Sequence, residues 1–260
     1  GEMTEGTFEL KKAASIEEFA EDLKKCTHLE AFSYCVFEAG ERGRIVTKAK
    51  KADNPGAVAR CKDDMGWSST GGILFLDYDP ADPANPLSRD ALVAAIRAAC
   101  PFLEKVKMLW RPSASSLIRN ETTGEELRGI AGQRLYIAVD KAGEIPRIGK
   151  AIYQYLWIAG HGRYEISGCG ATLPRTIVDL SVWDIARLDF TGGSVCETPL
   201  SQGALDPVVI PGEFEYLSCS DVKPLSVADQ KRLKISFDEA QTEDVIQRAS
   251  RTKQAWIETR

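Results

Sequence analysis

Two carboxylates, Asp77 and Asp79, follow the short apolar run at residues 73–76 and are the clearest candidates for chemistry in this sequence. Gly71-Gly72 precedes the run and Pro80 follows it, a pattern typical of a buried β-strand. Side chains two positions apart on a strand share one face, so the two carboxylates would project side by side and repel each other. Hard divalent cations favour carboxylate oxygen, and a pair of such ions commonly promotes in-line phosphoryl transfer. The pattern predicts a site for Mg²⁺ or Mn²⁺ or, as the plainer alternative, a turn of the Asp-x-Asp-Pro type.

A loop rich in small hydroxyl side chains follows a strand expected at residues 105–110. The loop begins after Arg111 and contains Ser113, Ser115 and Ser116. Small hydroxyl side chains beside a basic residue can line a phosphate or ribose pocket without crowding it. An ordinary serine-rich turn has the same composition, and composition alone favours that interpretation.

Two further polar residues lie next to apolar segments. Residues 135–139 are expected to form a strand with Arg134 at its start, and residues 176–178 lead into the carboxylate Asp179. A third carboxylate near the first two would complete a hard-metal site, and a cation beside it would hold a triphosphate. These positions are therefore expected to converge on one site.

Charge is unevenly distributed along the chain. The formal net charge is −5, which argues against a protein whose whole surface is rich in Lys and Arg for binding nucleic acid. Residues 42–62, here called the basic segment, nevertheless hold seven bases against the single acid Asp53. Such a segment is either a solvated loop or a binding site for the phosphate backbone of a nucleic acid. On the second interpretation, the residues that contact a nucleic-acid template are Lys48, Lys50, Lys51, Arg60 and Lys62.

The length of 260 residues, with 43% hydrophobic content, allows one large domain or two small ones. We expect a domain at residues 4–218, with an N-terminal α/β part at about 4–70 and a core at about 71–195, and then a helical tail or linker at 219–260.

No apolar run approaches the roughly 18 residues of a membrane span and no signal peptide opens the chain, so the expected location is cytoplasmic, without a membrane partner. The seven cysteines include no C-x-x-C pair, so neither a disulfide framework nor a zinc ribbon is expected.

Capping signals predict the main helices. Ser15, Ser88 and Ser226 each precede a segment with helical character, and Ile145-Pro146 opens an apolar segment that ends at Gly160. Gly1-Glu2-Met3 is interpreted as a remnant ahead of the native start.

The order of these motifs resembles that of the archaeo-eukaryotic primase superfamily, specifically the primase-polymerase domains of phages, plasmids and integrated elements. In that superfamily a hydrophobic strand ends in Asp-x-Asp, a small-x-His element follows, and a further hydrophobic strand ends in an acid. Here residues 74–79 (LFLDYD) fit the first element and residues 177–179 (IVD) fit the third. Further phrases similar to the mobile-element branch are RPSASS at 111–116, GQRLY at 132–136, IPR at 145–147, LWIAGHG at 156–162 and RLDFTGG at 187–193.

The resemblance covers residues from about 60 to 195 and implies an α/β (α+β) fold. The implied architecture is an RRM-like primase-polymerase catalytic sheet with an N-terminal α/β unit and a C-terminal helical tail. Where the family has its histidine, this chain has either Arg134 or the loop at 113–116. Such domains commonly precede a helicase ATPase, and because no G-x-x-x-x-G-K-[ST] motif occurs here, that motor would lie elsewhere in a longer chain.

The resemblance also implies an activity, namely template-dependent nucleotidyl transfer by a DNA primase or polymerase. Two Mg²⁺ or Mn²⁺ ions would be held by the catalytic residues Asp77, Asp79 and Asp179. Partners would be a single-stranded DNA template with its primer and nucleoside triphosphates. The residues that would hold the triphosphate are Arg134, Arg111, Ser113, Ser115 and Ser116.

Two other functions use the same residues. A metal-dependent nuclease needs the same carboxylates, because two metal ions serve hydrolysis as readily as transfer. A non-catalytic replication initiator would bind DNA through the basic segment and use its acids structurally.

Overall fold

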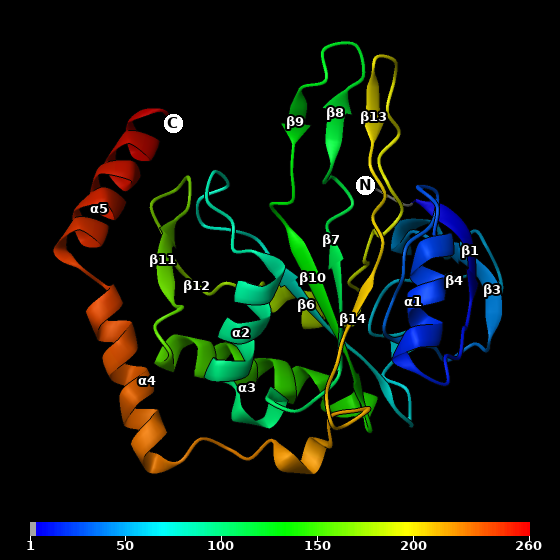
Figure 1. The fold of residues 1–260 in the computed structure, drawn as a ribbon, viewed down its shortest axis with the longest axis horizontal. Coiled ribbons are helices and arrows are strands. Elements are labelled where there is room, and N and C mark those ends of the chain that lie inside the picture. Colours follow the sequence, from blue (N-terminus) through cyan, green and yellow to red (C-terminus); the bar gives the residue numbers. More distant parts are fainter. Residues whose placement is uncertain (1–3) are drawn as a thin grey trace.

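The computed structural model describes residues 4–260 and shows a mixed α+β protein, as expected (Figure 1). Gly1-Glu2-Met3, interpreted above as a remnant, lie outside the described residues. No helix within residues 4–260 has both the length and the apolar character needed to cross a bilayer.

A four-stranded sheet forms the centre of the molecule, in the order β14-β7-β10-β6. The strands are β6 (Gly72–Tyr78), β7 (Met108–Pro112), β10 (Gln133–Val139) and β14 (Val208–Ile210). Because β10 runs antiparallel to both β6 and β7, those two strands are parallel and end at the same edge of the sheet. The start of β10 lies at this edge too, so the polar residues at the ends of all three strands are brought together.

Two helices cover one face of this sheet, α2 (Arg89–Ala99) and α3 (Ile145–Ile158). Ser88 caps α2 by accepting a hydrogen bond from the Ala91 amide, as predicted, and Pro146 occupies the first turn of α3. The order β6-α2-β7-β10-α3 is followed by a segment that returns to the sheet, where Val178 forms an antiparallel bridge to Tyr78 of β6.

The opposite face of the sheet is partly covered by an N-terminal unit. Its helix α1 (Ile16–Lys25), capped by Ser15, places Phe19 edge-on against Tyr136 of β10 at 5.4 Å between ring centroids. Residues 31–37 contain a two-residue strand and one isolated bridge at Phe32. The strands of this unit form two small sheets, from β1 (Glu5–Glu9), β3 (Arg42–Val46) and β4 (Val58–Ala59), and from β2 (Val36–Phe37) and β5 (Met65–Gly66).

A three-stranded arm projects beyond the central sheet at the top of Figure 1. It consists of β8 (Ile118–Asn120), β9 (Glu126–Arg128) and β13 (Leu200–Gln202), in the order β13-β8-β9. Short 3-10 helices connect the other elements, at Lys48–Lys50, Pro101–Leu103, Ala142–Glu144, Leu180–Trp183 (η4) and Cys219–Asp221.

The C-terminal tail is helical, as predicted. It contains α4 (Val227–Ala240), capped by Ser226, and α5 (Glu243–Glu258), on the side of the molecule away from the N-terminal unit (Figure 1). The α4 helix packs on α3, where Phe237 stacks on Trp157 with ring centroids 4.2 Å apart. The α5 helix lies against a hairpin of β11 (Arg163–Ile166) and β12 (Thr172–Arg175).

Candidate active site

The predicted polar residues of the central sheet meet on one face at one edge. Arg134 of β10 is the register partner of both Asp77 on β6 and Arg111 on β7, so these three side chains form a row across the sheet. The next row on this face contains Phe75 and Tyr136, whose rings stack at 5.4 Å. Three segments far apart in sequence therefore bring a carboxylate and two guanidinium groups together.

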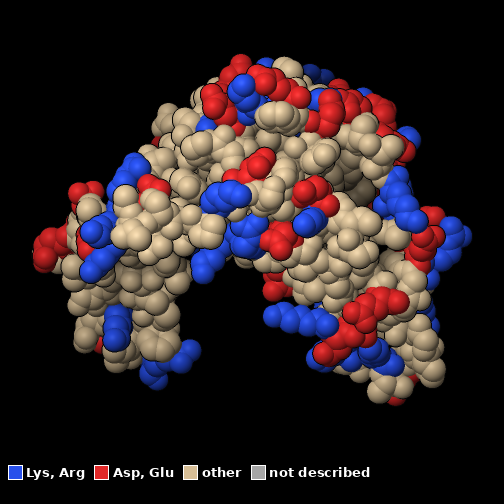
Figure 2. Space-filling model, turned by 90° about the horizontal axis from the view of Figure 1, so that it is seen from below, with Lys and Arg blue, Asp and Glu red and all other residues tan. Residues whose placement is uncertain are grey.

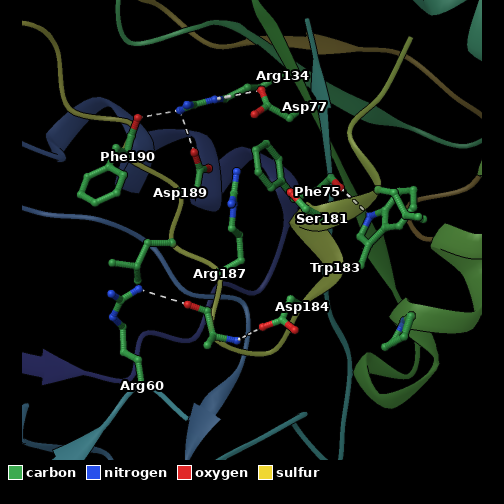
Figure 3. Close-up of a pocket in the computed structure, with 14 residues that line it drawn as sticks. Arg60, Phe75, Asp77, Arg134, Ser181, Trp183, Asp184, Arg187, Asp189 and Phe190 are labelled. Atoms are coloured by element: carbon green, nitrogen blue, oxygen red, sulfur yellow. Dashed lines mark hydrogen bonds and ion pairs between the residues drawn. The ribbon is translucent and has the colours of Figure 1, made fainter. Parts of the chain in front are cut away.

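A pocket of about 990 Å³ opens in front of Asp77 and Arg134. Its walls come from the central sheet, from residues 180–190 and from Arg60 of the N-terminal unit (Figure 3). The charged residues lining it are Arg60, Asp77, Arg134, Asp184, Arg187 and Asp189. Figure 2 shows a broad hollow between two projecting parts of the molecule, with Lys and Arg side chains along its border among Asp and Glu.

Asp77 lies in a setting that disfavours its negative charge. Its side chain is 20% exposed, and burial raises its pKa from 3.8 to about 6. The positive charge of Arg134 acts in the opposite direction, whereas the carboxylates of Asp79, Asp189 and Asp179 raise the pKa further. Burial is therefore the main cause of the raised pKa of Asp77, and the neighbouring carboxylates add to it.

Asp79 lies just beyond the end of β6 and is exposed. A Cβ atom built on Gly132 would lie 3.6 Å from Asp79 Oδ1 and 3.1 Å from Ser113 Oγ, which places Asp79 beside the serine loop. Within that loop Ser113 Oγ is 3.0 Å from Ser116 Oγ and 3.5 Å from Ser115 Oγ, and Ser116 is buried. The structure thus brings the serine loop and Asp79 together, with hydroxyl groups that hydrogen-bond to one another.

Asp179 is joined to Asp77 through the backbone, because its amide donates to the Asp77 carbonyl at 2.9 Å. Its carboxylate accepts hydrogen bonds from the amide and hydroxyl of Ser181, at 2.9 and 2.6 Å, and so caps η4. Arg187 Nη2 lies 3.7 Å from Asp179 Oδ2, and Arg175 Nη1 lies 3.9 Å from Oδ1. The third predicted carboxylate is therefore next to the first, with its oxygens already engaged.

The donor chemistry of this cluster fits a hard divalent cation. Within residues 4–260 no three His, Cys, Asp or Glu side chains are already arranged as a metal-ligand set. However, Asp77, Asp79 and Asp179 all supply carboxylate oxygen, and the mutual effect of their charges on Asp77 is what a bound cation would relieve.

Arg134 makes its shortest contacts away from Asp77. Its Nη1 atom lies 2.7 Å from Asp189 Oδ1 and donates to the Phe190 carbonyl at 2.7 Å, whereas its Nε atom lies 3.7 Å from Asp77 Oδ1 (Figure 3). Burial lowers the pKa of Arg134, but the neighbouring Asp189, Tyr136 and Asp77 outweigh burial and raise the pKa overall. Arg134 is therefore a fixed positive charge.

Arg111 is almost fully buried, with 4% exposure. It donates from Nε to the Leu205 carbonyl at 2.8 Å and from Nη1 to the Thr191 carbonyl. These bonds tie together two segments behind the site, and Arg111 is not among the residues that line the pocket.

Most of the basic segment is paired with acids. Lys48 lies 3.2 Å from Asp63 and Lys50 lies 3.8 Å from Glu5, while Lys51 forms a close ion pair with Asp64. Lys62 is exposed. Arg60 differs from the others, because it lines the pocket and donates to the Ala186 carbonyl at 3.1 Å.

Sequence reasoning did not identify two pocket residues, Arg187 and Asp189, as site residues. Both belong to the motif RLDFTGG at 187–193. The resemblance of this motif to the mobile-element branch was the signal that could have identified them as site residues. Asp189 is 2% exposed and accepts hydrogen bonds from Tyr34 and Tyr136, two residues that sequence spacing does not connect to it.

Comparisons of the chain with protein-family models, curated proteins and solved structures found no match.

Proposed function

We propose that this chain is a primase-polymerase that transfers nucleotides onto a primer or first nucleotide, directed by a DNA template and assisted by two divalent ions. The observation that supports this most directly is Asp77, a largely buried carboxylate with a raised pKa at the edge of a sheet, beside two further carboxylates and a pocket lined by three arginines. Carboxylates that can hold metal ions, next to arginines that can bind phosphate, are what metal-bound triphosphates require, and Arg60, Arg134 and Arg187 line the pocket here.

The topology supports the same proposal. Apart from the β8–β9 arm, the order β6-α2-β7-β10-α3, followed by a segment with one antiparallel bridge to β6, is compatible with the split β-α-β-β-α-β arrangement of RRM-like sheets. We propose that this sheet is the catalytic sheet, with Asp77 on its open face, and that the N-terminal unit and the helical tail flank it.

Triphosphate binding is assigned to the arginines of the pocket. Arg187 is 48% exposed in its side chain and only loosely paired with Asp179, so its donors remain free for phosphate oxygens. In Figure 3 it extends toward the side of the pocket where Arg134 and Asp77 lie, with Arg60 on the far side. Arg134 adds fixed positive charge behind them.

The carboxylates carry the metal-dependent part of the proposal. Asp77, Asp79 and Asp179 would hold Mg²⁺ or Mn²⁺, and Asp179 would exchange its hydrogen bonds from Ser181 for the ion. The chemistry supplied by two such ions is activation of the attacking hydroxyl and stabilisation of the leaving pyrophosphate. The chain itself positions the carboxylates through strand β6 and its bridge to Val178, and it orients the triphosphate through the pocket arginines.

The proposed partners are a single-stranded DNA template, its primer and nucleoside triphosphates. We propose that the protein acts in the cytoplasm and that a helicase ATPase accompanies it in a longer chain, as in the primase-polymerases it resembles.

Primer extension tests the proposal directly. Wild-type protein is incubated with a labelled primer-template, nucleoside triphosphates and Mn²⁺, beside Asp77→Asn and the control Asp90→Asn, an exposed aspartate on α2. We expect extension by the wild type and by the control and none by Asp77→Asn. Shortening of the primer would instead support a nuclease, and binding without either change would support a replication initiator.

A further inference from the structure

Asp189 is a buried carboxylate that the proposed chemistry does not use. Its side chain is 1% exposed and is surrounded by donors from two parts of the molecule. Tyr34 of the N-terminal unit donates to Oδ2 at 2.6 Å, and Tyr136 of β10 donates to the same atom at 2.9 Å. Burial and the charge of Asp189 raise the pKa of both tyrosines well above 10, so both hydroxyls stay protonated and act as donors.

The remaining oxygen of Asp189 faces Arg134. The Nη1–Oδ1 distance is 2.7 Å, a full 1.0 Å shorter than the 3.7 Å between Arg134 Nε and Asp77 Oδ1. Within the described chain, Arg134 Nε and Asp189 Oδ1 have no aligned hydrogen-bond partner, so the contact is an ion pair. Because Asp189 is more deeply buried than Asp77, attraction between opposite charges is stronger there, and Arg134 is held on the Asp189 side.

This preference matters because Arg134 is the basic register partner of Asp77. If the guanidinium paired closely with Asp77, it would neutralise that carboxylate and compete with a metal ion for its oxygens. The backbone makes the arrangement rigid, since Phe32 and Asp189 exchange two hydrogen bonds of 2.9 Å between the N-terminal unit and the pocket wall.

We propose that Asp189 is a positioning residue that holds Arg134 away from Asp77 and so keeps Asp77 free to bind a divalent ion. This inference rests on the proposed function, because it assumes that Asp77 is a metal ligand. Tyr34 of the N-terminal unit contributes to this arrangement, since its hydroxyl donates to Asp189, the residue that holds Arg134.

The test measures Mn²⁺ affinity by electron paramagnetic resonance, without nucleotide or DNA. In Asp189→Asn the negative charge that attracts Arg134 is removed, so Arg134 turns to Asp77, and Mn²⁺ binding weakens by about tenfold or more, as for other groups that orient a metal ligand. In the double variant Asp189→Asn, Arg134→Gln, the competing cation is gone and affinity returns to within about threefold of the wild type, well inside that tenfold loss. A purely structural role of Asp189 predicts no such recovery.

Two outcomes overturn the proposal: wild-type Mn²⁺ affinity in folded Asp189→Asn, or no recovery in the double variant. If Asp189→Asn does not fold, hydrogen exchange in the wild type provides the test. If Asp189 still holds Arg134 when metal is bound, the exchange rates of the Phe32 and Asp189 amides stay unchanged when Mn²⁺ is added. Loss of protection at these two amides contradicts the proposal. Failure of the proposed function looks different, because wild-type protein and Asp77→Ala would then bind Mn²⁺ equally.

Discussion

A carboxylate with a raised pKa is a cost to the folded protein unless something binds to it. Asp77 has this character because it is largely removed from water and because Asp79, Asp179 and Asp189 add negative charge around it. The raised pKa means that the folded state takes up a proton more readily than the unfolded state does. The residue is therefore destabilising when charged, which is common at sites that have a function other than stability.

The effect of Asp77 on stability depends on pH in a defined direction. Its folded pKa of about 6 lies above the ordinary 3.8, so its unfavourable contribution is absent below pH 4 and reaches its full size once the pH exceeds 6. We predict that Asp77→Asn in EDTA stabilises the protein at pH 8 by up to about 3 kcal/mol, or about 5 °C in Tm. At pH 4 the two proteins should melt together. Differential scanning fluorimetry at both pH values measures this, and equal melting at pH 8 would contradict the assignment of the pKa.

The role of Arg187 can be separated from the general effect of positive charge. We predict that Arg187→Ala raises the KM for nucleotide by about tenfold, because a charge-assisted bond to phosphate is lost. Arg175→Ala is the matched control, since Arg175 also lies near Asp179 and is similarly exposed but does not line the pocket. Steady-state extension at fixed template gives both values, and an equal rise in KM for the two variants would remove Arg187 from the phosphate site.

The elements of the site differ in how far the sequence could predict them. Strand β6 was predictable because its apolar run and flanking glycines are local signals, and the capped helices α1 and α2 were predictable for the same reason. The arm strands β8 and β9 were not predicted, since both are short and largely exposed, and β8 pairs with β13 some 80 residues away, while β9 pairs with β8. Local patterning carries no information about such pairing.

The short helix η4 joins the sheet to the pocket wall through a single tryptophan. Trp183 Nε1 donates to the Phe75 carbonyl of β6 at 2.9 Å, and its ring covers Gly149 of α3 so closely that a Cβ there would lie 2.2 Å from Trp183 Cδ2. Because Asp179 caps this helix, the position of Trp183 also affects the third carboxylate.

We therefore predict that Gly149→Ala displaces η4, reduces stability by about 1 to 3 kcal/mol and lowers extension activity. Gly143→Ala is the control, because a Cβ at Gly143 meets no atom within 4 Å, and it should be neutral or slightly stabilising. Thermal melts and extension rates distinguish the variants, and wild-type values for Gly149→Ala would show that α3 and η4 adapt to the added methyl group.

At the scale of the whole molecule, a net charge of −5 means that any nucleic-acid binding is restricted to regions where Lys and Arg are concentrated. The sequence correctly identifies the concentration of Lys and Arg at residues 42–62, but it cannot show which acids outside this segment pair with them. Glu5, Asp63 and Asp64 do so in the structure, and of the five predicted template contacts only Arg60 lines the pocket. Ion pairing across a surface depends on tertiary neighbours rather than on composition.

This distribution gives a prediction for single-stranded DNA binding. Replacing Lys48 and Lys50 together by alanine should leave the slope of log affinity against log salt unchanged, because removing them also frees their paired acids. Arg60→Ala should reduce the slope by roughly 0.7, the value for one phosphate contact to a single strand. Fluorescence anisotropy across a salt series measures the slopes, and a reduced slope in the lysine variant would return template binding to the basic segment.

The hydrogen bond between Tyr34 and Asp189 joins residues 155 positions apart, and this has a consequence for how the protein is made. As the chain leaves the ribosome, the N-terminal unit is synthesised long before the segment that completes its contact with the central sheet. Phe32 and Tyr34 must wait for that segment, and long-range closure of this kind slows folding relative to local contacts. A nascent chain that stops short of Asp189 carries Asp77 and Arg134 but not the carboxylate that pairs most closely with Arg134. Under the proposed function, a chain therefore gains the restraint on Arg134 only after Asp189 has been translated.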